Sequence, residues 1–480
     1  MRSTRSSEGR FFLLIDLHTL SDEDLKRWIL KRLGQHDVTS MIEGEEYYAD
    51  TQAILKKRRT AIGENGKPVD IVNLPNTIIT DNQYAKLVDQ KVGYLFSSLP
   101  DISAEDEDYQ KRLTDFFDKR MMRTLSKVAK DSFNCGVGWV FVYPDETGKE
   151  LRLKRVDPKA VIPCFVDDAR ESLSAVIYRR KELEFVDGKE KELEYVELYT
   201  DDGIRVFSYR DGALEQIEHV GYLRNAAGQW NWGKIPFVYF RYRDNEYNLL
   251  RRVKSLQDAI NLLLSNFGDM MLEDPRNTIL ILKGYDGTDL GDFRAQLAQY
   301  AAVKIIPEQG AGLEALTVEV NHENYQTILK LLKEKLIENG RGLDAKSDRS
   351  GQQPNELNIK SMYSDIELDA NLIELEFVAS FEYLQYFLRT LWGVSEDHVA
   401  TIAFKRNIMV NEREIVEMIR DSVGLISDKT LRSKHPLVEN PDEEEKRIEE
   451  QEEEKLEKFG LMPLRGGEDD GEDTEEEADE

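Results

Sequence analysis

A stretch of eight residues that begins at Gly340 is the nearest approach to a nucleotide-binding motif in this chain. It reads GRGLDAKS and ends in Lys346 and Ser347, the residue types that contact phosphate and a metal ion in a P-loop. A P-loop also needs a glycine before its lysine and a strand before its first glycine. Ala345 stands where that glycine belongs, and the preceding residues predict a helix. Nucleotide binding is therefore the weaker hypothesis for this stretch.

Other residues that could do chemistry are scattered along the chain. The stretch GENGKP at residues 63–68 has Pro68 in place of the metal-binding hydroxyl and predicts a turn. Asp81, Asp89 and Asp101 form no nuclease pattern, and no serine or cysteine nucleophile signature is present. The histidines have no metal-ligand spacing, at positions 18, 36, 219, 322, 398 and 435. We therefore expect no catalytic residue, no metal site and no cofactor.

Cysteine usage and hydropathy indicate a protein of a reducing compartment. Cys135 and Cys164 are too few for a disulfide framework or a four-ligand zinc site, which fits the cytosol. The apolar run at residues 11–15 is cut short by Asp16 and His18, so it does not predict a secretory signal. No stretch approaches the ~20 apolar residues of a membrane span, and we expect no contact with a membrane.

Charge is unevenly distributed along the 480 residues. The formal net charge is −28, and 33% of the residues are charged. Residues 441–480 hold 20 acidic and 5 basic side chains, a net charge of −15. The segment 460–480 ends in the run GEDDGEDTEEEADE. This run has almost no apolar side chain to offset its ordering entropy, and the segment is predicted to be disordered. Solubility and partner binding both remain open as its role.

A long polar linker, residues 342–358, separates two predicted helices. It reads GLDAKSDRSGQQPNELN, in which Leu343 and Leu357 are the only large apolar residues. Helix connections in compact domains are usually about 2–8 residues long, so a link of this length is expected to be functional or disordered. Basic residues lie on or beside it, at Lys330, Lys333, Lys335, Arg341, Lys346, Arg349 and Lys360. They could contact DNA phosphates, or they could form a solvated helix face with Glu334 and Glu338.

The segments around this linker predict long amphipathic helices. Residues 245–274 repeat apolar side chains at alternating steps of four and three, which predicts a helix of roughly 45 Å. Its apolar stripe is either a core face or a surface for neighbouring subunits. Further helices are predicted at 321–341 and 359–392. Between the first two, residues 275–320 predict strands at 279–282 and 303–306 around a small helix at 290–300.

The N-terminal half predicts a mixed domain of the α+β class. Helices are expected at about 21–34, 41–59 and 108–133, with another that ends near residue 95. Strands are expected at 138–143, 175–178, 195–199, 204–207 and 237–240. After the long helices, a strand at 401–405 precedes a helix at 412–421 and a charged helix or coil at 441–459.

A series of short motifs runs along the chain between about residues 20 and 450. They are Tyr47-Tyr48, Pro75-Asn76, VGYLF at 92–96, GVGW at 136–139, VDPKAVIP at 156–163, Ile235-Pro236, SLQDA at 255–259 with Ser265-Asn266, ILKG at 281–284, IAFKRN at 402–407 and ISDKT at 426–430. Their order and spacing resemble the portal proteins of tailed bacteriophages, of the Bacillus siphophage type. Thr77 departs from the pattern, because many relatives have asparagine there.

The resemblance implies a portal fold with an α+β wing, a helical stem, a small α/β clip and a helical crown, assembled as a ring. Residues 1–244 and 359–410 would form the wing, including its long helix and returning strand. Residues 245–274 and 321–341 would form the stem, 275–320 the clip, and 411–459 the crown before the acidic tail 460–480. The polar linker 342–358 would be a tunnel loop that faces a central DNA channel.

The resemblance also implies partners and candidate contact residues. The tunnel-loop residues that would face DNA are Lys346, Arg349, Gln352, Gln353 and Lys360. Stem residues that would face the channel are Lys330, Lys333, Lys335 and Arg341, and those that would pack subunits together are Leu256, Ile260, Leu263 and Phe267. Implied partners are double-stranded DNA, the terminase large subunit, a head-to-tail adaptor, and scaffolding and major capsid proteins.

The expected role is a channel for genome packaging and ejection at one vertex of the virion capsid, assembled in the host cytoplasm. A ring of twelve subunits is typical, and thirteen in isolated rings also remains open. Two other function classes stay as alternatives. One is a nucleotide-dependent nuclease or motor subunit, supported only by the Lys346-Ser347 stretch, and the other is a helical scaffold without a channel.

Overall fold

The computed structural model describes residues 17–62, 67–71, 74–146, 148–166, 169–186, 189–225, 228–273, 278–283, 312–317, 322–343, 356–406, 412–438 and 441–458. The chain divides into two compact units. The first unit comprises Met1–Lys346 and Met362–Asn407, and the second comprises Ser347–Ser361 and Ile408–Glu480. Both helices and sheets are present, so the expected α+β class is confirmed.

The largest sheet of the first unit is antiparallel, with five strands in the order β10-β9-β8-β7-β6. The strands are β6 (Val161–Phe165), β7 (Leu173–Val186), β8 (Lys189–Thr200), β9 (Gly203–Arg210) and β10 (Ala213–Val220). Helix α1 (Asp22–Gln35) contributes Leu25 and Ile29 to a core that also contains Phe207. The Ser21 hydroxyl accepts a hydrogen bond from the Asp24 N–H and so caps the start of α1, as its sequence predicted.

A second antiparallel sheet has three strands in the order β13-β4-β5. Its strands are β4 (Val137–Pro144), β5 (Leu151–Val156) and β13 (Phe237–Arg241). Trp139 and Phe237 are both about 1% exposed and belong to one apolar cluster. Gly136, with φ of 89°, ends the preceding helix, where a Cβ would lie 1.9 Å from the Glu246 carbonyl oxygen. Only glycine fits this close approach.

Among the described residues, the remaining strands form four two-stranded ladders, and three short 3-10 helices are also present. The ladders pair β1 (Thr60–Ile62) with β2 (Pro68–Asp70), β3 (Asp101–Ala104) with β16 (Ala400–Ala403), β11 (Leu223–Asn225) with β12 (Gly228–Trp230), and β14 (Thr278–Lys283) with β15 (Gly312–Thr317). The 3-10 helices are η1 (Leu17–Thr19), η2 (Ala53–Lys56) and η3 (Pro158–Ala160). The β3 and β16 pair joins the two sequence segments of the first unit.

Helices pack on these sheets around one long helix, α9 (Glu356–Trp392). The others are α2 (Thr39–Tyr48), α3 (Gln83–Phe96), α4 (Glu107–Phe116) and α5 (Lys119–Cys135). Phe377 of α9 packs against Phe96 of α3 and Phe240 of β13, with ring centroids 4.9 and 5.0 Å apart. An aromatic cluster therefore joins α9, α3 and the second sheet.

Several predicted helix boundaries were wrong for local reasons. The single helix expected at 108–133 is two helices, because the Asp118 carboxylate caps a new start by accepting from the Met121 N–H. The helix expected at 41–59 ends at Tyr48 and is followed by η2. Helix α9 begins at Glu356, so the polar linker is shorter than its sequence indicated.

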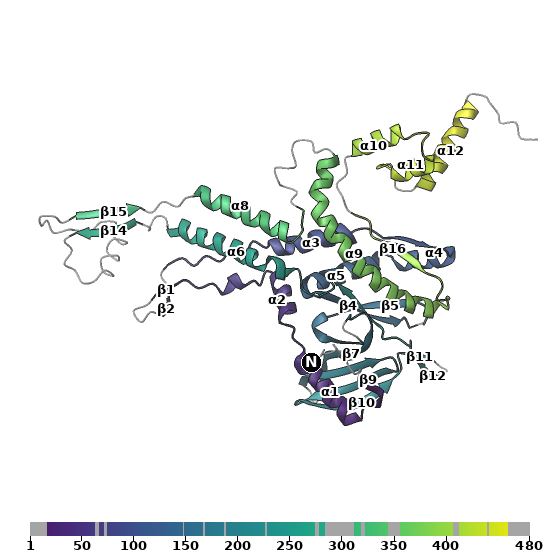
Figure 1. Cartoon of the computed structure of the whole chain (residues 1–480), viewed down its shortest axis with the longest axis horizontal. Coiled ribbons are helices and arrows are strands. Elements are labelled where there is room, and N and C mark those ends of the chain that lie inside the picture. The colour runs from purple at the N-terminus through teal and green to yellow at the C-terminus, as the bar shows by residue number, and fades with distance from the viewer. Residues whose placement is uncertain are drawn as a thin grey trace, which may run out of the picture. The chain divides into compact units, whose positions relative to one another are not determined.

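Helices α6 (Leu250–Glu273) and α8 (His322–Asn339) lie side by side and extend away from the sheets (Figure 1). The Phe267 and Tyr325 rings hold them together, with centroids 5.1 Å apart. At 1.5 Å per residue α6 is about 36 Å long, shorter than predicted because it begins at Leu250. The β14–β15 ladder follows their outer ends (Figure 1). The predicted strand at 279–282 is confirmed, while the strand at 303–306 and the helix at 290–300 lie outside the described residues.

The described residues of the second unit include the helices α10 (Glu412–Asp421), α11 (Asp428–Lys434) and α12 (Pro441–Lys458). Ser427 caps α11 by accepting from the Thr430 N–H. Arg432 of α11 pairs with Glu445 of α12, with 2.6 Å between Nη2 and Oε1. The helix expected at 412–421 is confirmed. The segment 441–459, for which helix and coil were both open, is helical over Pro441–Lys458, while the tail from residue 459 lies outside the described residues.

Candidate functional site at the base of the polar linker

Helix α8 ends in a Schellman arrangement that fixes the direction in which the polar linker leaves. The Gly342 N–H donates to the Ile337 carbonyl at 2.9 Å, and the Arg341 N–H donates to the Glu338 carbonyl at 3.0 Å. Arg341 takes the left-handed position, with φ of 51°, which glycine usually occupies in this motif. The two neighbouring glycines must therefore serve another purpose.

That purpose is close packing against Leu87 of α3. A Cβ at Gly340 would lie 2.2 Å from Leu87 Cδ2, and one at Gly342 would lie 2.5 Å from Leu87 Cδ1. Glycine lets the helix end approach α3 without steric overlap. The glycines that resembled part of a P-loop are thus explained by packing, and the stretch follows a helix rather than a strand. Lys346 and Ser347 lie outside the described residues.

Adding a methyl group at this contact should destabilise the first unit. Gly340→Ala is expected to lower the free energy of unfolding by about 1–3 kcal/mol, because Leu87 cannot move away without a loss of packing. The matched control is Gly93→Ala in α3, where a Cβ meets nothing within 4 Å. That variant should gain up to about 1 kcal/mol from helix propensity. Guanidinium denaturation, followed by tryptophan fluorescence, measures the free energy of unfolding of both variants. Equal changes in that free energy for the two variants would contradict the packing argument.

Gln90 of α3 holds the first residue of the linker through its backbone. Its Nε2 donates to the Leu343 carbonyl at 2.7 Å, and its Oε1 accepts from the Leu343 N–H at 2.9 Å. One amide side chain therefore satisfies both backbone groups of Leu343, as a neighbouring strand would. The linker base is fixed to α3 immediately before the undescribed residues begin.

A buried carboxylate on α9 completes this base. Asp369 is 0% exposed and pairs with Lys91 of α3, which is 1% exposed, at 2.7 Å between Oδ2 and Nζ. Arg243 also pairs with Asp369, and Arg341 Nη1 lies 3.8 Å from its Oδ1. Lys91 Nζ donates in addition to the Arg341 carbonyl at 2.9 Å. One carboxylate thus joins α3, α9, the residues after β13 and the end of α8.

Charge at this junction is positive overall, because three cationic side chains surround a single carboxylate. Burial lowers the pKa of Lys91 to about 8, while the Asp369 carboxylate opposes that shift. The ammonium group therefore remains mostly charged at neutral pH. The sequence contained a signal for both residues that was not used: each is a charged residue within an apolar helical stripe, between Val88 and Val92 for Lys91 and between Ile366 and Ile373 for Asp369.

A second polar network binds the segment 74–82, which precedes α3, along the side of α6. Alternate backbone N–H groups donate to side chains spaced four residues apart, from Thr77 to Asp269, from Ile79 to Ser265 and from Asp81 to Asn261. A further bond runs from the Tyr84 N–H to Gln257 at 3.0 Å. The four side chains on α6 are all at most 5% exposed. This side-chain ladder connects α6 to α3 and hence to the linker base.

Lys57 completes the ladder at its outer end by pairing with Asp269, with 2.7 Å between Nζ and Oδ2. Two motifs that carried the family resemblance, Pro75-Asn76 and SLQDA with Ser265, lie in or beside this ladder. Buried polar groups need hydrogen-bond partners. The backbone N–H groups of the segment 74–82 supply them, which explains why polar residues occur at buried positions of α6. A polar residue at every fourth position of the helix was the available sequence signal.

The predicted DNA-facing and channel-facing residues fall into two groups. Lys346, Arg349, Gln352 and Gln353, and the side chain of Lys360, lie outside the described residues. Lys333 pairs with Asp81 at 2.6 Å, and Lys335 pairs with Glu338 at 2.7 Å. Lys330 is exposed on α8, while Arg341 belongs to the Asp369 junction. Their orientation toward a channel stays a prediction.

The predicted subunit-packing residues on α6 differ in burial within one chain. Ile260 is 0% exposed and forms part of the core. Leu256, Leu263 and Phe267 are half-buried, and Phe267 contacts Tyr325 of α8. Other apolar side chains of the helix pair are exposed, namely Leu262, Met271 and Leu272 on α6 and Ile328 and Leu331 on α8. Subunit packing stays a prediction, and these exposed residues are additional candidates for it.

Residues considered for chemistry are engaged in separate structural contacts. Asp81 pairs with Lys333, Asp89 pairs with Lys130 at 2.7 Å, and Asp101 pairs with Lys405 at 2.8 Å. Both cysteines are buried and free, and burial raises the pKa of Cys164 to about 11 and that of Cys135 further. A thiol held protonated in this way is a poor nucleophile.

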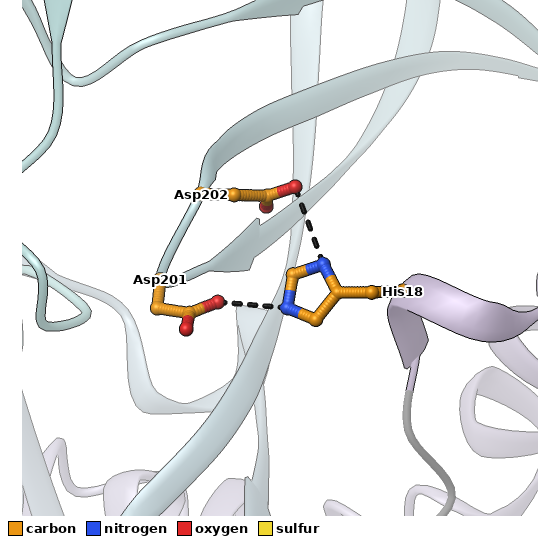
Figure 2. A group of neighbouring side chains, drawn as sticks. All are labelled: His18, Asp201 and Asp202. Atoms are coloured by element: carbon orange, nitrogen blue, oxygen red, sulfur yellow. Dashed lines mark hydrogen bonds and ion pairs between the residues drawn. The ribbon is translucent and has the colours of Figure 1, made fainter.

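Within the described ranges, one group of three side chains has metal-ligand atoms close together, His18, Asp201 and Asp202. Figure 2 shows the imidazole between the two carboxylates, with Nε2 2.9 Å from Asp201 and Nδ1 3.3 Å from Asp202. The two imidazole nitrogens already contact both carboxylates, so an ion is not needed to explain the arrangement. The contact connects η1 to the turn between β8 and β9, and the group is largely exposed. A structural ion pair is a sufficient explanation.

Among the described residues, no helix is long and apolar enough to cross a membrane.

Comparison with known proteins gives matches over most of the chain. Residues 30–458 match the family model described as phage portal protein, SPP1 Gp6-like. The portal protein of Clostridium phage phiCD119 is 27% identical over 422 residues, which cover 85% of this chain and 91% of that protein. The portal protein of Bacillus phage SPP1 is 24% identical over 459 residues, covering 92% of this chain and 90% of that protein.

Proposed function

The chain belongs to the phage portal protein family of the SPP1 Gp6-like type, and from this premise we propose that it assembles into a ring around a channel for double-stranded DNA. The ring would occupy one vertex of the capsid and serve in genome packaging and later in ejection. The observation that carries this proposal is the arrangement of α6 and α8, a helical pair extending from an α+β body with a β-ladder beyond its outer end.

The parts of the chain have distinct roles in this proposal. Helices α6 and α8 are the stem, and the β14–β15 ladder with residues 275–320 is the clip, which would dock the terminase large subunit and then the head-to-tail adaptor. The sheets with α1–α5 and α9 are the wing, and α10–α12 are the crown. Scaffolding and major capsid proteins would contact the outer surface. The protein is proposed to act without catalysis, as a conduit for work done by the terminase.

The polar linker is proposed as the tunnel loop. Support comes from its base, which Gln90 and Lys91 of α3 and Asp369 of α9 hold in place. A segment that must contact moving DNA needs a rigid attachment at its root. The formal charge of −28 per subunit makes a ring that repels a polyanion overall, so DNA could slide while a few loop cations touch it.

The direct test of this proposal is the purified particle itself. Negative-stain images should show rings with an axial hole, and native mass spectrometry should count the subunits, distinguishing twelve from thirteen. Images without an axial hole would favour a helical scaffold. ATP hydrolysis by the purified protein would favour the motor or nuclease alternative.

Exposed apolar residues of the stem should matter for assembly. Leu262→Asp with Leu331→Asp is expected to reduce the ring fraction, because a carboxylate would have to be desolvated between subunits. Leu262 and Leu331 are 48% and 50% exposed in one chain, so the subunit itself should keep its circular-dichroism spectrum. Ile260 is unsuitable for this test because its burial within the chain makes unfolding the expected result.

Native mass spectrometry measures the ring fraction. The matched control is Val399→Asp, at a residue that is 59% exposed outside the stem. Rings at the parental level in the stem double variant would contradict the role of these residues in subunit packing.

A further inference from the structure

The start of α6 carries a hollow with an unusual concentration of arginine. The hollow measures about 320 Å³ and is lined by Arg243, Arg251 and Arg252, with Tyr242, Asp244, Asn245, Tyr247 and Asn248. Asp244 is the single carboxylate among these lining residues. In a chain with a formal charge of −28, three guanidinium groups around one hollow call for an explanation.

Two of these arginines have no carboxylate partner in the part of the chain that the structure describes. They are Arg251 and Arg252, and both are exposed. Both lie in the first turn of α6 (Leu250–Glu273), where the helix dipole disfavours positive charge by about 0.3–1 kcal/mol per group. Their position is therefore unfavourable for folding, which points to a ligand of opposite charge.

The surrounding residues hold the hollow in shape and turn nearby acidic groups away from it. Asn248 donates to the Ser40 and Asn134 carbonyls and accepts from the Arg251 N–H at 3.2 Å. The Arg251 guanidinium lies 3.7 Å from the centroid of the Tyr247 ring. Glu246, the next carboxylate in the chain, is committed to Arg170 and Arg241, at 2.8 and 3.1 Å.

The hollow shares Arg243 with the positively charged junction at the linker base. Arg243 lines the hollow and pairs with Asp369, yet its buried Nε has no hydrogen-bond acceptor among the described residues. The positive charge of Arg252 also disfavours protonated Lys91. Cationic groups therefore extend from Arg341 and Lys91 through Arg243 to Arg251 and Arg252.

We propose that this hollow binds a phosphate group, and that in the assembled ring the group is a backbone phosphate of the DNA duplex. Guanidinium groups bind phosphate oxygens bidentately, and the hollow has room for one phosphate group. The assignment to DNA rests on the proposed portal function, whereas phosphate binding itself does not. The arginines would add a second contact zone beside the root of the polar linker.

The test compares Arg251→Gln/Arg252→Gln with a control that removes the same charge elsewhere. The control is Arg120→Gln/Arg123→Gln, which changes two exposed arginines of α5. The affinity of assembled rings for a short DNA duplex is measured against salt concentration. Removing two phosphate contacts should reduce the slope of log affinity against log salt by about 2, and the control should leave it unchanged. Equal slopes for parent and hollow variant overturn the assignment of the ligand to DNA.

Two further measurements separate the possible sources of the negative charge. Inorganic pyrophosphate should raise the Tm of the parent but not that of the hollow variant. If pyrophosphate does so while the duplex slope is unchanged, the DNA assignment is overturned and free phosphate is the ligand. If the hollow variant loses rings and neither ligand distinguishes it from the parent, the arginines pair with carboxylates of a neighbouring subunit and the proposal fails. Absence of rings from the parent protein would instead refute the proposed function.

Discussion

An Asp369→Ala variant should lose about 3–5 kcal/mol of its free energy of unfolding, because the change leaves Lys91 and Arg243 buried without their shared carboxylate. Both cations are at most 13% exposed, so water cannot replace the lost partner. The measurement is guanidinium denaturation at one fixed protein concentration, since assembly contributes to apparent stability. The matched control is Asp365→Ala, an exposed carboxylate one turn earlier on α9, which should change stability by less than about 0.5 kcal/mol.

Lys91→Met separates the roles of the partners in this junction. This substitution should lower the free energy of unfolding by less than Asp369→Ala does. Asp369 keeps its ion pair with Arg243, and the methionine side chain fills most of the space of the lysine. An Asp369→Ala variant no less stable than the Asp365→Ala control would show that the junction contributes nothing to folding. The linker base would then need another explanation.

Replacing residues 344–353 by a Gly and Ser segment of equal length should leave rings intact and abolish most DNA packaging. The proposed tunnel loop supplies the side chains that touch the duplex, among them Lys346 and Arg349, and the replacement removes those groups without shortening the chain. Ring formation is measured by native mass spectrometry, and packaging by protection of DNA from nuclease in a reconstituted reaction with the terminase.

A deletion of the same ten residues is the length control. It should also form rings, because the anchoring bonds from Gln90 to Leu343 lie outside the deleted segment. Packaging at the parental level by the Gly and Ser variant would refute the tunnel-loop assignment. Packaging lost only in the deletion would mean that the loop's reach matters and its side chains do not.

Much of the architecture follows from periodicity and capping in the sequence. Ser21 before three acids predicted the start of α1, and the alternating steps of four and three predicted α6. Local rules failed where a single side chain outweighed the pattern. Asp118 starts a new helix inside a continuous helical sequence, since its carboxylate satisfies an N–H that would otherwise stay unpaired.

The linker base could be located from the sequence only in part. The polar linker after α8 was evident, but its partner Gln90 lies 253 residues before Leu343. Asp369 lies beyond the far end of the linker, and no local rule connects these residues. Gly340 and Gly342 stood out in the sequence, but the sequence did not show why glycine is needed there. The reason is the close approach of Leu87, which lies on another helix. Contacts of this kind depend on tertiary packing, which periodicity does not report.

The side-chain ladder between residues 74–82 and α6 also limits how these parts can move. Four residues of a helix advance about 6.0 Å, whereas two residues of extended chain advance about 6.6 Å. The difference between these two spacings adds up from one rung of the ladder to the next. After three rungs at Thr77, Ile79 and Asp81, the next bond skips to Tyr84 and uses the longer Gln257 side chain.

Such a ladder excludes the neighbouring register. A slip of one residue would turn every donating N–H group away from α6, because alternate residues of an extended chain face opposite sides. The segment 74–82 therefore cannot slide by one residue along α6 without breaking these bonds together. Because this segment leads into α3, the ladder ties the position of α6 to that of α3.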